Sequence, residues 1–142
     1  MNMRMSVSVV VAAVCAFIAS SLWYSSVLFG AQFLALSGLP ASITPVASKV
    51  AMELLRNVIL ASVICWLLSK QGPVKLTAAL VLAAALWLGF PFILLSGSVM
   101  WQGVPLVLAL IHAGDWFVKI GVVTLLLWLI NLKSAVWSAQ LA

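Results

Sequence analysis

The stretch His112-Ala-Gly-Asp115-Trp-Phe-Val-Lys119 decides the fold, because it places three ionisable side chains inside a long apolar segment. That segment runs from Pro105 to Ile130 and is long enough to cross a bilayer, which takes about 20 helical residues. An aspartate or lysine at the centre of such a helix costs about 2.5–3.5 kcal/mol on insertion scales, so these side chains are expected to avoid lipid. Their (i, i+3) and (i, i+4) spacings place all three on one helix face. The sequence therefore predicts a membrane helix whose polar face turns toward other helices.

The composition of the whole chain is also typical of a membrane protein. Of its 142 residues, 66% are hydrophobic and 6% are charged, whereas about 25% of the residues in a soluble domain are charged. The net charge of +5 comes from basic residues that are scattered along the chain, so no nucleic-acid partner is expected. The predicted fold class is all-α: a transmembrane four-helix bundle in which residues 1–142 form a single domain within the lipid bilayer.

The apolar runs predict four membrane spans. They cover residues 5–29, 45–68, 74–95 and 105–130. Thr44 and Pro45 are expected to start the second span, with threonine as the cap and proline at the first helical position. Pro91 is expected to kink the third span because proline removes one backbone hydrogen bond. Residues 31–44 and 96–104 are predicted to be loops.

Lysine and arginine predict the orientation, because cytoplasmic loops carry an excess of both. Four spans place both ends of the chain on one side, and on that side lie Arg4, Lys70, Lys75 and Lys133. The opposite side has only Lys49, at the mouth of a helix. The apolar run after Arg4 continues to Phe29, longer than a signal peptide requires, so the first span is expected to stay uncleaved. The prediction is a multi-pass protein of the inner (cytoplasmic) membrane with both termini cytoplasmic.

The second span carries a polar group that matches the fourth. Glu53 and Arg56 have the (i, i+3) spacing that lets side chains meet, and Asn57 follows them. They lie about 12–17 Å into their span, and the ionisable residues of the fourth span lie about 10–21 Å into theirs. Both spans run in the same direction, so the two groups are expected at one depth, facing each other or a shared cavity. The candidate polar intramembrane site is Glu53, Arg56, Asn57, His112, Asp115 and Lys119.

Other chemistry-bearing residues give weaker signals. Trp23 and Tyr24 fit an aromatic belt at the membrane surface, and are a possible aromatic wall of a ligand site. Cys15 and Cys65 lie in separate apolar runs without a CxxC motif, so they indicate neither a redox centre nor a metal site. His112 has too few histidine or cysteine neighbours for a metal. No catalytic residue, metal or cofactor is predicted.

Three stretches carry a resemblance to a known family. They are Leu22-Trp-Tyr-Ser-Ser-Val-Leu-Phe-Gly30, Leu86-Trp-Leu-Gly-Phe90 and His112-Ala-Gly-Asp115. The chain resembles the domain-of-unknown-function family numbered 1761, small bacterial membrane proteins whose first span ends in a Trp-Tyr-Ser-Pro-Leu-Leu-Phe-Gly-like motif. Ser26 stands where that motif has proline. The resemblance implies a four-span membrane protein and assigns no catalytic residue.

Three classes of function remain open. The first is a small transporter or ligand-binding protein with its site between the second and fourth spans, expected as a homo-oligomer because four short helices enclose little volume. The second is an accessory subunit of a larger membrane complex, in which the charged residues form an ion-pair network for assembly or helix register. The third and weakest is an intramembrane enzyme that uses His112 and Asp115 as acid and base, since no nucleophile motif accompanies them.

Overall fold

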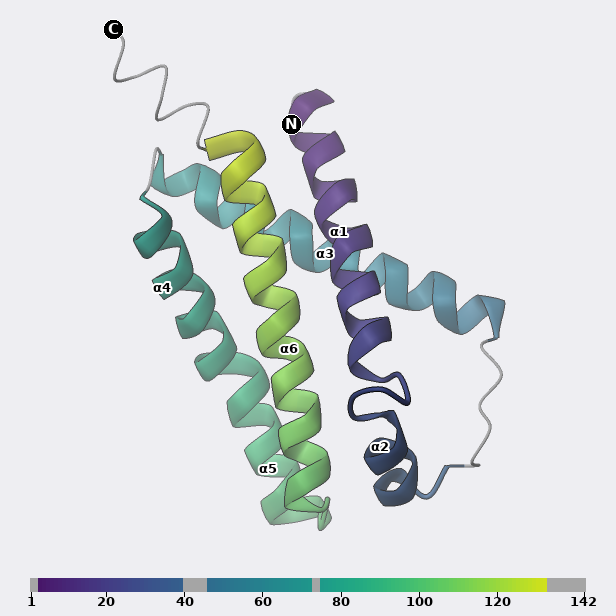
Figure 1. Ribbon diagram of the computed structural model, residues 1–142. Coiled ribbons are helices and arrows are strands. Elements are labelled where there is room, and N and C mark those ends of the chain that lie inside the picture. Colours follow the sequence, from purple (N-terminus) through teal and green to yellow (C-terminus); the bar gives the residue numbers. More distant parts are fainter. Residues whose placement is uncertain (1–2, 40–45, 73–74, 133–142) are drawn as a thin grey trace, which may run out of the picture.

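The computed structural model describes residues 3–39, 46–72 and 75–132, and within these ranges it contains helices and no strands (Figure 1). The elements are α1 (Met3–Trp23), α2 (Gly30–Ser37), α3 (Ala47–Gln71), α4 (Leu76–Trp87), the π-helical η1 (Leu88–Phe92), α5 (Ile93–Gln102), α6 (Leu106–Leu127) and the π-helical η2 (Trp128–Leu132). Four helical segments in these ranges are long and apolar enough to cross a membrane. The predicted all-α fold with four spans is thereby confirmed.

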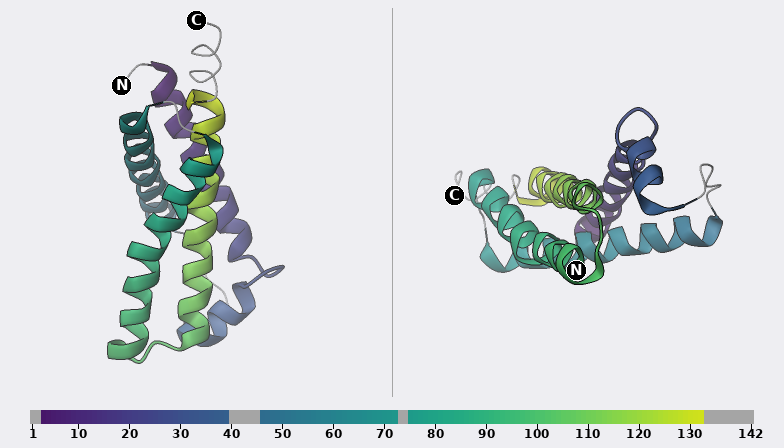
Figure 2. Two further views of the ribbon diagram at one scale, coloured as in Figure 1. Left: turned by 90° about the vertical axis from the view of Figure 1, so that its left-hand side faces the viewer. Right: turned by 90° about the horizontal axis from the view of Figure 1, so that it is seen from below.

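α6 is the central helix of the fold. α1 lies along one side of it, α4 and α5 lie along the other, and α3 crosses behind them obliquely (Figure 1). α1 begins and α6 ends at the same end of the molecule, as four spans require. The N-terminal part of α3 extends beyond the other helices (Figure 2). The helices therefore differ from a regular bundle of four nearly parallel helices.

Small side chains pack the helices closely at the end of the molecule where α1 begins. Ala12, Ala16 and Ala61 are completely buried, and Ile64 and Val123 fill the space between them. Lipid tails are as apolar as these side chains, so helices in a membrane associate through close van der Waals contact, which small residues permit. This end of the molecule is a well-packed apolar core.

The first membrane helix is shorter than predicted. α1 ends at Trp23 instead of Phe29, and α2 occupies part of the predicted loop 31–44. The predicted helix start at Thr44 and Pro45 lies outside the described residues. The second and fourth predicted spans correspond to α3 and to α6 with η2.

Residues 24–29 form a turn that ends α1, and backbone hydrogen bonds hold it. The Gly30 N–H donates to the Ser25 carbonyl at 2.9 Å, and the Phe29 N–H donates to the Trp23 carbonyl at 3.1 Å. A Cβ atom on residue 30 would lie 2.7 Å from the Ser25 carbonyl oxygen, so the close approach requires glycine. The sequence motif that ends in this glycine is therefore a compact turn and not the last part of a membrane helix.

The third membrane segment is longer than predicted. The expected span 74–95 and loop 96–104 are wrong, because α5 continues the helix to Gln102. The serines of this stretch suggested a loop, but their hydroxyls donate to carbonyls one turn back and so remain compatible with a helix. Pro91 lies inside the π-helical η1, which accommodates the missing N–H. Gly103 ends α5 with a left-handed φ of 67°.

A close approach of Trp23 on α1 to Gly114 on α6 predicts the effect of one substitution. A Cβ atom at Gly114 would lie 2.5 Å from Cζ2 of Trp23. We expect Gly114→Ala to destabilise the protein by about 1–3 kcal/mol through overpacking, measured as a lower unfolding temperature in detergent. Gly121→Ala is the matched control in the same helix, since nothing lies within 4 Å of its Cβ position. Equal unfolding temperatures for the two variants would contradict the close approach.

Candidate functional site

A pocket of about 420 Å³ lies between α1, α2, α3 and α6. Its lining residues follow the apolar core along α1 but precede it along α3 and α6, which run in the opposite direction. The pocket therefore lies at one level of all three helices, away from the end where α1 begins. Five of the predicted site residues line it: Glu53, Arg56, His112, Asp115 and Lys119.

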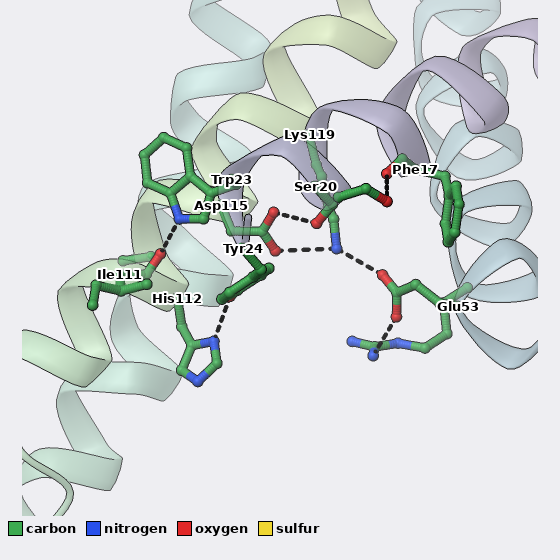
Figure 3. A network of polar contacts seen from close by, with 12 residues as sticks. Phe17, Ser20, Trp23, Tyr24, Glu53, Ile111, His112, Asp115 and Lys119 are labelled. Atoms are coloured by element: carbon green, nitrogen blue, oxygen red, sulfur yellow. Dashed lines mark hydrogen bonds and ion pairs between the residues drawn. The ribbon is translucent and has the colours of Figure 1, made fainter. Parts of the chain in front are cut away.

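Lys119 is the centre of the polar network around the pocket. Its Nζ atom lies 3.1 Å from Oδ2 of Asp115, on the same helix, and 2.7 Å from Oε1 of Glu53 on α3 (Figure 3). The side chains of Lys119 and Asp115 are 5% and 6% exposed. Such burial is very unfavourable for a single charge and is tolerated when an opposite charge lies in contact. The lysine therefore joins α3 to α6.

The remaining carboxylate oxygens also have partners. The Ser20 hydroxyl on α1 donates to Oδ1 of Asp115 (Figure 3). Oε2 of Glu53 accepts a hydrogen bond from the Arg56 guanidinium at 2.9 Å. Each carboxylate oxygen thus has a hydrogen-bond or ion-pair partner, and the two acids balance the two bases. Both ion pairs predicted from sequence spacing are present: Glu53 with Arg56 in α3, and Asp115 with Lys119 in α6.

Two aromatic residues at the end of α1 turn toward α6. Trp23 Nε1 donates to the Ile111 carbonyl at 3.0 Å, and the Tyr24 hydroxyl lies 2.7 Å from Nδ1 of His112 (Figure 3). Their polar groups are thus occupied by α6, and the belt at the membrane surface stays a prediction. Tyr24 lines the pocket, whereas Trp23 does not. Of the two, only Tyr24 takes the position expected for an aromatic wall.

Asn57 does not join the pocket. It is 2% exposed and does not contribute to the lining. Its Nδ2 atom has no hydrogen-bond partner among the described residues. Asn57 follows Arg56 directly in the sequence, but one residue is about 100° of rotation around a helix, so the two side chains point in different directions.

Sequence reasoning missed several residues that complete the site. Trp116 lies under both cations, with its ring centre 5.8 Å from Arg56 Cζ and 5.4 Å from Lys119 Nζ. Its (i, i+3) spacing to Lys119 was the available signal. Phe33 lines the pocket from α2, a helix that was predicted to be a loop. Ser20 belongs to the serines of the first span, but nothing local marks it as the partner of an aspartate 95 positions away.

The described residues do not offer a protein-built metal site. In residues 3–39, 46–72 and 75–132, no group of three histidine, cysteine, aspartate or glutamate residues is placed to hold a metal ion. The carboxylates that line the pocket are engaged by neighbouring side chains. The pocket therefore offers hydrogen bonds, one exposed cation and aromatic surface.

The long apolar helices and the charge-balanced pocket define a multi-pass membrane protein with a polar site among its helices. The chain belongs to the family described as protein of unknown function DUF1761, which matches residues 7–128 and confirms the resemblance seen in the sequence. No curated protein and no solved structure matches the chain. Family membership therefore assigns no substrate, reaction or site residue.

The burial of the Lys119–Asp115 pair predicts how its removal acts on stability. We expect Lys119→Met to destabilise the protein by about 3–5 kcal/mol, because Asp115 then stays buried with the Ser20 hydroxyl as its remaining partner among the described residues. The double variant Lys119→Met, Asp115→Leu removes both charges and should be more stable than the single variant. Unfolding midpoints in mixed detergent and sodium dodecyl sulfate measure the difference.

Arg56→Gln serves as the comparison for this pair. The Arg56 side chain is 54% exposed, so losing its ion pair should cost about 1 kcal/mol or less. A double variant no more stable than Lys119→Met would show that the buried pair does not act as a unit.

Proposed function

We propose that the protein is a small transporter or ligand-binding protein of the bacterial inner membrane. Its site is the pocket between α1, α2, α3 and α6, and its ligand is a small polar or ionised molecule. The observation that supports this proposal is the position of the ion-pair network beside an open pocket. Ionisable residues within membrane spans are rare and commonly mark ligand or ion pathways.

The pocket favours binding over a purely structural network. A network that only fixed the register of the helices would need no open space beside it, because unfilled space forfeits van der Waals contacts. Here the buried part of the network, around Lys119, is fully paired, whereas the Arg56 side chain is 54% exposed and lines the pocket. A volume of about 420 Å³ falls within the range typical of small-molecule sites.

The proposed orientation places the pocket in the outer half of the membrane. Basic residues favour cytoplasmic termini, and the pocket lies away from the end of the molecule where α1 begins. A ligand would then enter from the side opposite the cytoplasm. The apolar core would close the path on the cytoplasmic side in this conformation.

Reporter fusions test the orientation. Green fluorescent protein fused after Ala142 should fluoresce, and alkaline phosphatase fused there should be inactive, because the fusion point is cytoplasmic in this topology. Alkaline phosphatase fused after Gln102, between α5 and α6, should be active. The reverse pattern of activities would contradict cytoplasmic termini.

Blocking the pocket tests the proposed function without touching the ion pairs. Ser21 lines the pocket and is exposed, so Ser21→Trp should fill it and leave the network intact. Native mass spectrometry of gently extracted protein should then show a bound non-protein mass in the wild type that is absent from this variant. Leu22→Trp is the matched control, since Leu22 is exposed on the same helix and does not line the pocket. Absence of any bound mass from the wild type, or equal retention by both variants, would refute the proposal.

An accessory role in a larger membrane assembly is the second candidate. It is favoured by the N-terminal part of α3, which extends beyond the other helices (Figure 2). On this helix Met52, Leu55 and Ile59 are each more than half exposed. Another membrane helix, from a second copy or from a different protein, could pack against such a surface. The same mass spectra report subunits that remain attached, so they separate assembly from ligand binding.

A further inference from the structure

We infer that the ligand is an amphipathic anion, in which a carboxylate or phosphate group is attached to an apolar chain or ring. This inference rests on the proposed function and specifies the ligand class of the same pocket. It follows from the hydrogen-bonding capacity that the pocket leaves unused and from the character of its walls.

The acidic side chains of the pocket are already occupied. Asp115 accepts a hydrogen bond from Ser20 and forms an ion pair with Lys119, and the Glu53 oxygens accept from Lys119 and Arg56. A cationic ligand in the pocket would also lie beside Lys119 and Arg56, which carry the same sign of charge. Displacing Lys119 would strand a buried charge, which is strongly unfavourable. The pocket is therefore poorly suited to a cation.

The most exposed member of the ion-pair network is a hydrogen-bond donor, Arg56. A guanidinium has five N–H donors, and the described contacts of Arg56 engage NH1 with Glu53 at 2.9 Å. The side chain is 54% exposed and lies over the Trp116 ring, which leaves donors available on its open side. Planar guanidinium groups bind carboxylate and phosphate through two parallel hydrogen bonds. Arg56 is thus the anchor for an anionic group.

His112 offers a second donor. Its Nδ1 atom is paired with the Tyr24 hydroxyl, and its other ring nitrogen points away from Tyr24 (Figure 3). When the tyrosine donates to Nδ1, the hydrogen of the neutral imidazole lies on Nε2. Both Arg56 and His112 line the pocket, so each presents a donor to it.

The remaining walls are aromatic. Phe17 of α1, Phe33 of α2 and Trp116 of α6 all line the pocket. Phe33 is held in place by edge contacts with Tyr24 and His112, at ring-centre distances of 5.0 and 5.7 Å. An apolar chain or ring would be stabilised against these surfaces in proportion to the area it buries, about 25 cal/mol per Å². A simple inorganic anion would leave this surface unused.

Binding of radiolabelled decanoate to the full-length protein in dodecyl maltoside tests the inference, with a scintillation proximity assay as the readout. Binding should be saturable in the wild type and weaker by about tenfold or more in Arg56→Gln, which loses the charged donor. Lys49→Gln is the matched control, because Lys49 lies on the same helix, is exposed and does not line the pocket. It removes one positive charge and should bind as the wild type does. Equal losses of decanoate binding in both variants would show that the loss follows from the lower net charge of the protein. This result would overturn the inference.

Competition separates the possible sources of the anion. Displacement of decanoate by phosphatidylglycerol would identify a membrane lipid as the source. If phosphatidylglycerol does not displace decanoate but unlabelled octanoate does, the source is a water-soluble carboxylate. Both outcomes support an amphipathic anion. Displacement by decyltrimethylammonium as strong as that by decanoate would overturn the charge assignment, and displacement by inorganic phosphate at equal concentration would overturn the need for an apolar part.

Failure of this inference is distinguishable from failure of the proposed function. If native mass spectrometry finds a bound mass that Ser21→Trp removes, but decanoate binding is absent or unaffected by Arg56→Gln, the pocket binds a ligand of another class. If neither a bound mass nor decanoate binding is found, both proposals fail.

Discussion

The burial of one ammonium group, that of Lys119, constrains much of this structure. A lysine that is 5% exposed is stable in its charged form only when carboxylates contact it. Asp115 provides one from the same helix, and Glu53 provides the other from α3. Asp115 in turn accepts a hydrogen bond from Ser20 on α1. One buried cation therefore couples the positions of three helices that are distant in the sequence.

Different interactions hold the helices together at the two ends of the molecule. At the end where α1 begins, alanines such as Ala12 and Ala61 permit close packing without polar contacts. At the other level, the same helices carry ion pairs and aromatic rings and leave a pocket of about 420 Å³. The apolar end thus supplies the close packing that the polar end lacks.

The motif at the end of α1 acquires a structural meaning in this context. The turn at residues 24–29, closed by Gly30, ends α1 and redirects the chain so that α2 lies beside α6. Phe33 of α2 then contacts Tyr24 and His112 at the pocket. The stretch from Leu22 to Gly30, which carries the family resemblance, thus contributes Tyr24 to the pocket and leads into the helix that contributes Phe33.

Much of the fold and part of the site were predictable from the sequence, because both depend on local spacing. Runs of apolar residues determine which segments can cross a bilayer, and helical periodicity places Glu53 near Arg56 and Asp115 near Lys119. The end of α1 and the length of the third span were predicted wrongly, because serine and glycine occur in turns and in membrane helices alike. Depth counting placed the two polar groups at one level, but periodicity alone could not exclude Asn57 from the pocket.

The sequence by itself determined the class of the protein, its four apolar helices and the pairs formed within each helix. Only the tertiary structure decided that Lys119 bridges to Glu53, that Ser20 binds Asp115, and that α3 crosses the other helices obliquely. The physical reason is the range of the interactions. Contacts within a helix depend on residues three or four positions apart, whereas contacts between helices depend on the packing of whole surfaces that no short stretch of sequence specifies.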